Sequence, residues 1–391
     1  MIIEPKIRGF ICTTAHPEGC LENVKRQAEY AKSHPVKGAR KALVIGASAG
    51  YGLATRICAA FSCKADTLGV IFDKPASGGR TASAGWYNTA ALERLAAEEG
   101  LYAATINGDA FSKEVKEGAI ARIRRDLGQV DLVIYSLAAP RRTLPDGTVR
   151  SSVLKTVGAP YTERTIDLKK RELAEVTIPP ASEEEIAATV EVMGGEDWED
   201  WIEALAAAGV LTKDAVTAAY SYIGPERTHP IYLDGSIGRA KEDLYQASRR
   251  IEEKHPGLRA FISVNKALVT QSSSAIPIVP LYISILYKVM KEMGLHEGCI
   301  EQMSRLFCDR LYADNLPLDN RGMIRLDDWE MRPEVQAKVD AAWKRLADGS
   351  LEELADIDGY WEDFYQMFGF HLPGVDYGKD VETEVEIPSI G

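Results

Sequence analysis

Short apolar runs alternate with longer segments of mixed polarity along the first third of the chain. The apolar runs are rich in Val, Ile and Leu and predict strands at 41–45, 67–72, 102–107 and 130–135. The mixed segments place apolar residues at helical spacing and predict helices over 19–32, 50–62, 84–99 and 112–127. Repeated strand–helix units predict a parallel sheet joined by right-handed crossovers. The pattern therefore predicts an α/β protein with a Rossmann-type, doubly wound parallel sheet.

This pattern is interrupted between about residues 140 and 230. Turn signals at Pro145 and Asp146-Gly147 predict a hairpin, and an extended piece follows at 172–178. Helices are predicted from Ser182 to Gly209, and again over Thr212–Tyr220. Strand-like sequence resumes at 260–264. We interpret 140–230 as a substrate-side insertion in a single domain of residues 1–391, with extra segments at both ends, including an extended arm at 7–12.

An apolar segment over Thr270–Tyr287 contains Pro277 and Pro280, so it predicts an interrupted helix. Such a helix suits an acyl chain, and it suits a buried core helix equally well. The tail from Pro333 to the end of the chain is predicted to be helical and then rich in loops. Its aromatic side chains are interpreted as core and docking residues.

Charge and composition exclude several classes of protein. The formal net charge is −12, which argues against a nucleic-acid partner because phosphate neutralisation needs a basic face. The longest apolar stretch, Ala275–Leu286, is too short to span a bilayer, so no membrane insertion is expected. Six scattered cysteines indicate neither a disulfide framework nor a metal site. They favour a reducing, cytoplasmic location.

The most informative motif is a glycine-rich turn after the strand predicted at 41–45. Gly46, Gly50 and Gly52 stand in the segment Gly46-Ala47-Ser48-Ala49-Gly50-Tyr51-Gly52, where that strand ends and a helix begins. In a dinucleotide-binding turn, glycines allow the tight bend, the approach of a pyrophosphate to bare backbone, and close packing of helix on strand. The helix N-terminus adds unpaired N–H groups and partial positive charge for the anion. The motif therefore predicts a dinucleotide site.

Other strand ends extend this prediction. Phe72-Asp73 closes the second predicted strand, and a carboxylate there accepts hydrogen bonds from the adenosine ribose and repels a 2′-phosphate. Asp73 therefore favours NAD(H) over NADP(H). Further segments at the same sheet edge are predicted to face the cofactor: Asp109-Ala110, Leu137-Ala138 and Leu268-Val269-Thr270.

A cluster of tyrosines and a lysine supplies the candidate catalytic groups. Tyr222 precedes Gly224-Pro225, and Tyr232 lies nine positions before Lys241. On a continuous helix this spacing puts Tyr232 and Lys241 on opposite faces. Gly235 and Gly238 make a break plausible, with Tyr232 on a loop and Lys241 in the following helix.

These residues resemble a known family. Gly46 through Gly52, Tyr222-Ile223-Gly224-Pro225-Glu226, Tyr232-x8-Lys241 and the segment from His296 to Gln302 are similar to the single-chain NADH-dependent trans-2-enoyl-CoA reductases. These are also described as a class of enoyl-acyl-carrier-protein reductase. The resemblance runs nearly end to end. Aspartate stands at 73 where many relatives carry glutamate.

The resemblance implies reduction of the carbon–carbon double bond of a trans-2-enoyl thioester by NADH, in fatty acid synthesis or a butyrate-type fermentation. Tyr232 then corresponds to the proton donor, Lys241 to the cofactor-binding lysine and Tyr222 to the substrate-contacting tyrosine. The NAD-contacting positions are Gly46, Ala47, Ser48, Ala49, Gly50, Tyr51, Phe72, Asp73, Asp109, Ala110, Leu137, Ala138, Leu268, Val269 and Thr270.

Two alternatives stay open at this stage. A carbonyl-reducing short-chain dehydrogenase shares the cofactor turn but has a closer tyrosine–lysine spacing. A dinucleotide-sensing protein without turnover would not need Tyr222, Tyr232 and Lys241 together. The sequence does not choose between coenzyme A and acyl carrier protein as the carrier, and a monomer is expected because the insertion and tail can cover assembly surfaces.

Overall fold

Seven parallel strands form the centre of the molecule in the computed structural model, which describes residues 1–9, 11–346 and 351–390. Their order across the sheet is β13-β12-β11-β6-β3-β4-β5. The order reverses between β3 and β6, which makes their carboxyl ends the expected ligand crevice of a doubly wound sheet. The strands are β3 (Lys41–Ile45), β4 (Asp66–Ile71), β5 (Ala103–Asn107), β6 (Val130–Tyr135), β11 (Leu211–Ser221), β12 (Arg259–Val264) and β13 (Ile324–Arg325).

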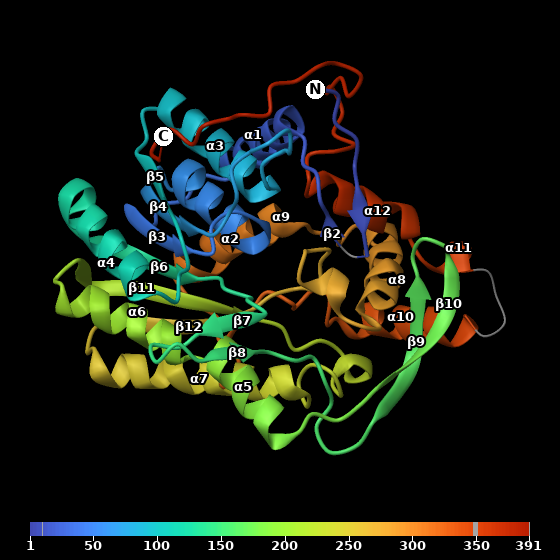
Figure 1. The fold of residues 1–391 in the computed structure, drawn as a ribbon. Helices are drawn as coiled ribbons and strands as arrows, with labels where there is room; N and C mark the ends of the chain where they lie inside the picture. The colour runs from blue at the N-terminus through green and yellow to red at the C-terminus, as the bar shows by residue number, and fades with distance from the viewer. Residues whose placement is uncertain (10, 347–350, 391) are drawn as a thin grey trace.

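Helices cover both faces of this sheet (Figure 1). Successive side chains of a strand point to opposite faces, so Ala42 and Val44 join one core cluster while Leu43 and Ile45 join the other. The first cluster includes side chains of α1 (Pro17–Lys32), α2 (Gly50–Ile57), α3 (Ala84–Glu98) and α9 (Cys299–Leu306). The second includes side chains of α4 (Lys113–Arg122), α6 (Glu196–Ala207) and α7 (Ser236–Lys254). The predicted Rossmann-type architecture is confirmed.

The predicted hairpin after β6 is present. β7 (Arg141–Thr143) pairs antiparallel with β8 (Val149–Ser151). The extended piece at 172–178 is β10 (Glu172–Ile178), which pairs with β9 (Tyr161–Asp167) in a second ribbon. This ribbon projects beside α8 and α10, at the right of Figure 1. Ser182 caps α5 (Glu183–Met193), as the sequence predicts.

One predicted helix is wrong. Residues 212–220 form most of β11, which lies between β6 and β12 in the central sheet. A strand buried on both faces shows no alternation of polar and apolar residues, and the run Ala215–Ala219 is buried throughout. Its alanines and the preceding Lys213-Asp214 gave it a helical composition. The predicted insertion therefore contains a strand of the core sheet.

The remaining elements flank this framework. β1 (Ile7–Arg8) and β2 (Ile11–Cys12) pair antiparallel within the predicted arm at 7–12, of which residue 10 lies outside the described residues. The apolar segment is interrupted as predicted, because a 3₁₀ turn at Ser273–Ala275 precedes α8 (Val279–Glu292), which carries Pro280 in its first turn. The tail contributes α10 (Pro333–Arg345), α11 (Leu351–Leu354) and α12 (Ile357–Gln366).

The C-terminal tail covers the outer edge of β5. The backbone N–H of Thr105 donates to Ser389 Oγ at 2.8 Å, and Ser389 Oγ donates to Glu93 Oε1 at 2.7 Å. Glu93 is held in turn by the fully buried Arg56, 3.8 Å away. Further back, the tail crosses α3, where Trp86 Nε1 donates to the backbone oxygen of Val385 at 2.6 Å. The last strand of the sheet therefore has a chain segment on its free side.

Within the ranges just given, no helix is both long enough and apolar enough to cross a bilayer.

Candidate active site

The glycine turn has the geometry that its sequence predicts. Gly46 has φ +83°, and a Cβ there would lie 2.2 Å from the backbone oxygen of Ser136. A Cβ on Gly52 would lie 1.9 Å from the oxygen of Gly46, so the start of α2 packs against the strand end. Gly50 opens α2 after Ala49, whose side chain makes no capping hydrogen bond. The first amides of the helix are therefore not capped by a side chain, which suits a phosphate at this end.

The turn lies at the point where the strand order reverses. β3 and β6 are neighbours, and a Cβ on Gly46 would lie 3.1 Å from Leu137 Cδ2. The predicted segments Gly46–Tyr51 and Leu137-Ala138 are therefore side by side at the carboxyl edge of the sheet. This is the crevice in which doubly wound folds bind dinucleotides.

Asp73 is held firmly at the end of β4. Its backbone N–H donates to Asn107 Oδ1 at 2.8 Å, and Asn107 Nδ2 donates back to its carbonyl oxygen at 2.9 Å. Ser83 Oγ donates to Asp73 Oδ1 at 2.7 Å. A Cβ on Gly85 would lie 2.4 Å from the same oxygen, so α3 begins directly against the carboxylate. Phe72 beside it is 79% exposed, which leaves its ring available to a ligand.

Asp109 and Ala110 follow β5 at the same edge. Asp109 Oδ1 accepts a hydrogen bond from the backbone N–H of Phe111 at 3.0 Å. Ala110 is buried, and its oxygen accepts from Trp201 Nε1 at 3.1 Å. The structure therefore gives both residues a local structural role at the position where the sequence predicts cofactor contact.

The segment after β12 is fixed by side chains from other elements. The N–H of Val269 donates to the Tyr287 hydroxyl at 3.1 Å, and the N–H of Thr270 donates to Ser273 Oγ at 2.9 Å. Leu268 and Val269 are buried, and a Cβ on Gly50 would lie 3.8 Å from Thr270 Cγ2. The predicted segment 268–270 therefore lies against the start of α2.

A second contact ties this segment to the glycine turn. The hydroxyl of Tyr51 donates to the backbone oxygen of Lys266 at 2.7 Å. The N–H of Lys266 donates to Gln302 Oε1 of α9 at 3.0 Å. Three predicted cofactor segments, at 46–51, 137–138 and 268–270, are thus in contact with one another or with their direct neighbours.

Tyr222 and Tyr232 are brought together. Tyr222 directly follows β11, and Tyr232 lies in the turn before α7. Their ring centroids are 4.7 Å apart at an interplanar angle of 79°, an edge-to-face contact. Burial raises the pKa of both phenols above the ordinary value of a tyrosine, so both carry their protons at neutral pH.

Lys241 reaches the same strand end from α7. Its Nζ donates to the backbone oxygen of Tyr220 at 2.9 Å, two residues before Tyr222. Burial lowers the pKa of Lys241 to about 8. The predicted break before the helix is confirmed, because Tyr232 lies outside α7 and a Cβ on Gly238 would lie 2.4 Å from its backbone oxygen. Tyr232 and Lys241 therefore both meet the end of β11.

Glu330 is a residue that the sequence analysis missed. It is fully buried, and its Oε1 accepts hydrogen bonds from the hydroxyls of Tyr222 at 3.0 Å and Tyr282 at 2.7 Å. A signal was present, since Asp327-Asp328-Trp329-Glu330 follows a short strand at the carboxyl edge of the sheet. That strand, β13, has only two residues and was not predicted.

His296 and Glu297 have structural surroundings. The ring of His296 packs against the ring of Tyr287 with centroids 4.5 Å apart, and burial lowers its pKa to about 3, so it is neutral. Glu297 pairs with Arg305 at 2.5 Å. The surroundings of both residues therefore indicate a structural role.

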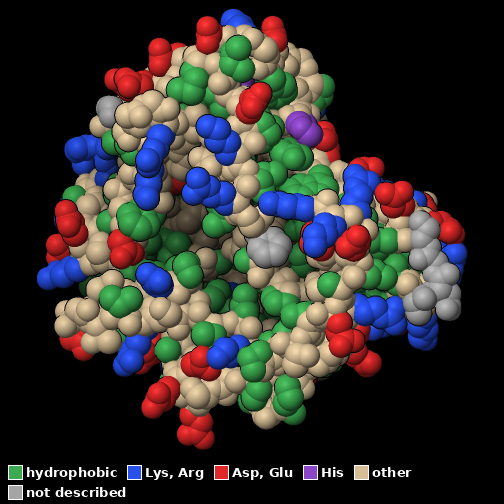
Figure 2. All heavy atoms as spheres, turned by 45° about the vertical axis from the view of Figure 1, so that its right-hand side comes forward, with side chains coloured by type: hydrophobic (Ala, Val, Ile, Leu, Met, Phe, Trp, Pro, Cys, Tyr) green, Lys and Arg blue, Asp and Glu red, His purple; other side chains and the backbone are tan. Residues whose placement is uncertain are grey.

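Figure 2 shows the face that comes forward when the right-hand side of Figure 1 is turned toward the viewer. It is hollowed near the centre, between the part that carries α1 and α3 and the part that carries α5 and α7. Hydrophobic side chains are visible around the hollow, and Lys and Arg side chains gather along its upper rim. This combination suits a ligand with an apolar part and an anionic part.

Three family models match the chain. The NAD(P)H binding domain of trans-2-enoyl-CoA reductase matches residues 2–78, and the trans-2-enoyl-CoA reductase catalytic region matches residues 80–312. The chain belongs to the trans-2-enoyl-CoA reductase family. A third model, described as the enoyl reductase FAD binding domain, matches residues 318–381.

Relatives in this family are similar over their whole length. A trans-2-enoyl-CoA reductase [NADH] from Ruminiclostridium cellulolyticum is 53% identical, and an enoyl-[acyl-carrier-protein] reductase [NADH] from Flavobacterium johnsoniae is 56% identical. Each alignment covers 100% of both chains. Relatives of nearly equal similarity are therefore named for different carriers.

Solved structures of the family have the same fold. The trans-2-enoyl-CoA reductase of Treponema denticola in complex with NAD has a TM-score of 0.96 and 46% identity, covering 99% of this chain and 100% of that one. The enzyme of Clostridium acetobutulicum in complex with NADH has a TM-score of 0.95 and 43% identity, covering 98% of each chain. The family is NADH-dependent, which agrees with the glycine turn and with Asp73.

Several aromatic rings of the family's C-terminal region are packed in the core of this chain. Trp343 and Tyr360 are each 1% exposed, and Phe364 is 2% exposed. Phe368 and Phe370 are buried too, and Trp361 and Tyr365 pack half-buried against the same core, which confirms the prediction that the tail's aromatic side chains are core and docking residues.

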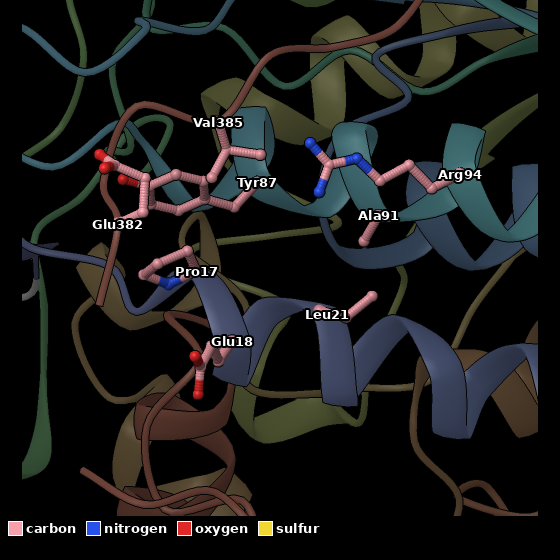
Figure 3. A pocket seen from close by; sticks show the side chains of 8 residues that line it. All are labelled: Pro17, Glu18, Leu21, Tyr87, Ala91, Arg94, Glu382 and Val385. Carbon is pink, nitrogen blue, oxygen red and sulfur yellow. The ribbon is translucent and has the colours of Figure 1, made fainter. Parts of the chain in front are cut away.

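A separate cavity of about 190 Å³ lies between α1, α3 and the C-terminal tail (Figure 3). Pro17 and Leu21 of α1 line it together with Tyr87 and Arg94 of α3. None of the predicted site residues lines this cavity. This cavity is therefore separate from the candidate site at the sheet edge.

Proposed function

We propose that this chain reduces the carbon–carbon double bond of trans-2-enoyl thioesters with NADH, and that Tyr222, Tyr232 and Lys241 carry the reaction. The observation that supports this most directly is the edge-to-face pair of Tyr222 and Tyr232 at the end of β11, where Lys241 also arrives. NADH, when bound, supplies a hydride to the β-carbon of the substrate. The protein would stabilise and protonate the enolate that hydride transfer produces.

Tyr232 is the proposed proton donor. As the β-carbon gains a hydride, negative charge develops on the thioester oxygen, and a phenol aimed at that oxygen stabilises the enolate in a site that excludes water. The phenol proton then passes to the enolate, and solvent returns a proton to the tyrosine. Burial raises the pKa of Tyr232, so the donor is protonated throughout the physiological range. Tyr222 is the proposed substrate contact beside it.

Lys241 and the sheet edge are proposed to hold the cofactor. Lys241 would donate to the ribose on the nicotinamide side, and Asp73 would accept from the adenosine ribose. The turn at 46–51 would bind the pyrophosphate. The remaining proposed contacts are Phe72, Asp109, Ala110, Leu137, Ala138, Leu268, Val269 and Thr270.

The acyl carrier of the substrate is proposed to be coenzyme A or acyl carrier protein. The protein is proposed to be a monomeric single domain in a reducing compartment. Both carriers are anionic, which suits the basic rim seen in Figure 2. All six cysteines are free thiols, which supports the compartment. Comparing kcat/KM for crotonyl-CoA and for crotonyl-acyl carrier protein tests which carrier is used, and light scattering tests whether the protein is a monomer.

The reaction itself is tested by loss of NADH absorbance with crotonyl-CoA, with a ketone, and with no substrate. Oxidation with crotonyl-CoA alone supports the proposal, whereas oxidation with the ketone indicates a carbonyl reductase and no oxidation indicates a binding protein. Tyr232→Phe should bind NADH normally and lose about 10²- to 10⁴-fold in kcat. Tyr377→Phe is the matched control, because among the described residues its hydroxyl makes hydrogen bonds to Leu372 and Gly369 of the tail. Near-normal kcat in Tyr232→Phe would contradict the role.

A further inference from the structure

The two carboxylate oxygens of Glu330 contact two parts of the candidate active site: the tyrosine cluster, and the segment that leads into residues 268–270. Oε1 accepts from the hydroxyl of Tyr222 at 3.0 Å and from that of Tyr282 at 2.7 Å. Oε2 accepts from the backbone N–H of Ala267 at 2.7 Å, immediately before the cofactor segment 268–270. The carboxylate is fully buried, so these donors replace the water that it has lost.

The three hydrogen bonds donated to Glu330 suit a carboxylate, which only accepts hydrogen bonds. Burial raises its pKa, and nearby Asp327 does so as well, while buried Lys266 and the hydrogen bonds from Ala267 and Tyr282 act in the opposite direction. Burial also raises the pKa of Tyr222 and Tyr282, so each is a phenol that donates its proton. A buried carboxylate is costly unless it is hydrogen-bonded in this way.

The loop that carries Glu330 is itself fixed. Gln336 of α10 donates from Nε2 to the backbone oxygen of Glu330 at 2.8 Å and to the Tyr282 hydroxyl at 3.2 Å. Movement of the carboxylate would therefore disturb α10 and α8 as well as the site. On the other side, the Tyr222 ring holds the ring of Tyr232 in edge-to-face contact at 4.7 Å. A Cβ on Gly224 would lie 2.7 Å from the Tyr222 hydroxyl, which leaves that hydroxyl little room to move.

We propose that Glu330 is a positioning residue for this reaction: by fixing the Tyr222 hydroxyl with one oxygen and Ala267 with the other, it sets the tyrosine pair against the cofactor segment. The inference rests on the proposed function, because it acts through Tyr222 and Tyr232. It assigns to the C-terminal region, 318–381, a part in the active site through a carboxylate.

A double-mutant cycle tests this proposal. Glu330→Gln keeps the shape of the side chain but has one acceptor oxygen, so it cannot accept from Ala267 and from the two tyrosines together. With NADH saturating, we expect kcat to fall about tenfold or more in Glu330→Gln. In a Tyr222→Phe background, where the hydroxyl is already gone, the same substitution should change kcat less than about twofold.

A purely structural role predicts a different pattern. Loss of a buried acceptor would then lower the melting temperature and reduce kcat by the same factor in both backgrounds. Tyr377→Phe serves as the remote partner, since the effects of Glu330→Gln and Tyr377→Phe should multiply. NADH titration by fluorescence shows that each variant is folded and binds cofactor. Should Glu330→Gln not fold, Glu330→Asp keeps the charge, shortens the reach by one methylene, and enters the same cycle with the same expectations.

The outcomes distinguish failure of the proposed role of Tyr222 from failure of the proposed role of Glu330. If Tyr222→Phe alone leaves kcat unchanged, the proposed role of Tyr222 fails and the inference fails with it. If Tyr222→Phe lowers kcat but the factors for Glu330 and Tyr222 multiply, only the inference is overturned. The same holds if Glu330→Gln has kcat within twofold of the wild type.

Discussion

Lys241 is expected to set the alkaline limb of the pH profile for NADH. Burial lowers its pKa to about 8, from 10.5 for an exposed lysine, because the charged ammonium loses water that the single bond to the oxygen of Tyr220 only partly replaces. The protonated form is the one that donates to a ribose hydroxyl. It accounts for about nine-tenths of the molecules at pH 7 and about one-tenth at pH 9.

Since kcat/KM reports the free enzyme, kcat/KM for NADH should fall about tenfold per pH unit above pH 8. Neither Tyr222 nor Tyr232 titrates in this range, because burial raises the pKa of both. The assay is the initial rate of NADH oxidation with saturating crotonyl-CoA between pH 6 and about pH 10.

Two variants identify the group responsible. Lys241→Met should lower kcat/KM for NADH and remove the limb, since no titrating amine remains. Lys241→Arg keeps its charge over the whole range, so its profile should be flat whatever its absolute rate. A limb near pH 8 that persists in Lys241→Met would show that another group titrates, and a wild-type limb starting only near pH 10 would refute the argument from burial.

Three further predictions address the cofactor turn and the core. Asp73→Asn removes the charge that repels a 2′-phosphate, so the ratio of kcat/KM for NADPH to that for NADH should rise about tenfold; an unchanged ratio in steady-state kinetics would place selectivity elsewhere. Gly52→Ala puts a Cβ 1.9 Å from the oxygen of Gly46 and should weaken NADH at least about tenfold in a fluorescence titration, whereas normal affinity would mean that the turn can widen. Trp198→Ala leaves a cavity where a side chain is 0% exposed and removes a 2.9 Å hydrogen bond to Thr217, so urea unfolding should show that the free energy of unfolding falls by about 3–5 kcal/mol. A fall of less than about 1 kcal/mol would show that neighbouring side chains move in to fill the cavity.

Much of the fold was predictable because its elements are local. β3 and β6 have the bounds that the hydrophobic pattern predicts, and the glycine turn between β3 and α2 is encoded in seven consecutive residues. The break between Tyr232 and Lys241 was also visible, since Gly235 and Gly238 interrupt the helix pattern there. In each case the physical signal lies within one turn of the chain.

β11 and β9 were missed for a different reason. Residues 215–219 form a strand because β6 and β12 lie on either side and helices cover both faces, and none of these neighbours is visible in a short window of sequence. β9 needs β10 as its partner in the same way. Strand propensity depends strongly on such context, so an alanine-rich central strand resembles a helix when considered alone.

The candidate site shows the same division. Tyr222, Tyr232 and Lys241 lie within twenty residues of one another, and a motif could therefore identify them. Glu330 reaches Tyr222 across 108 positions of sequence, through a loop that follows a strand of two residues. Only the packing of α8, α10 and β13 against the sheet edge reveals that contact.

The tail laid along β5 also bears on how the protein behaves among other proteins. An exposed edge strand offers unpaired backbone amides to any extended polypeptide that contacts it, and this is a common route to aggregation. Here Ser389 already occupies the amide of Thr105, and the opposite border of the sheet is a strand of only two residues. Removing the residues from Ser389 onward should therefore leave the active site folded but make the protein prone to precipitate at high concentration.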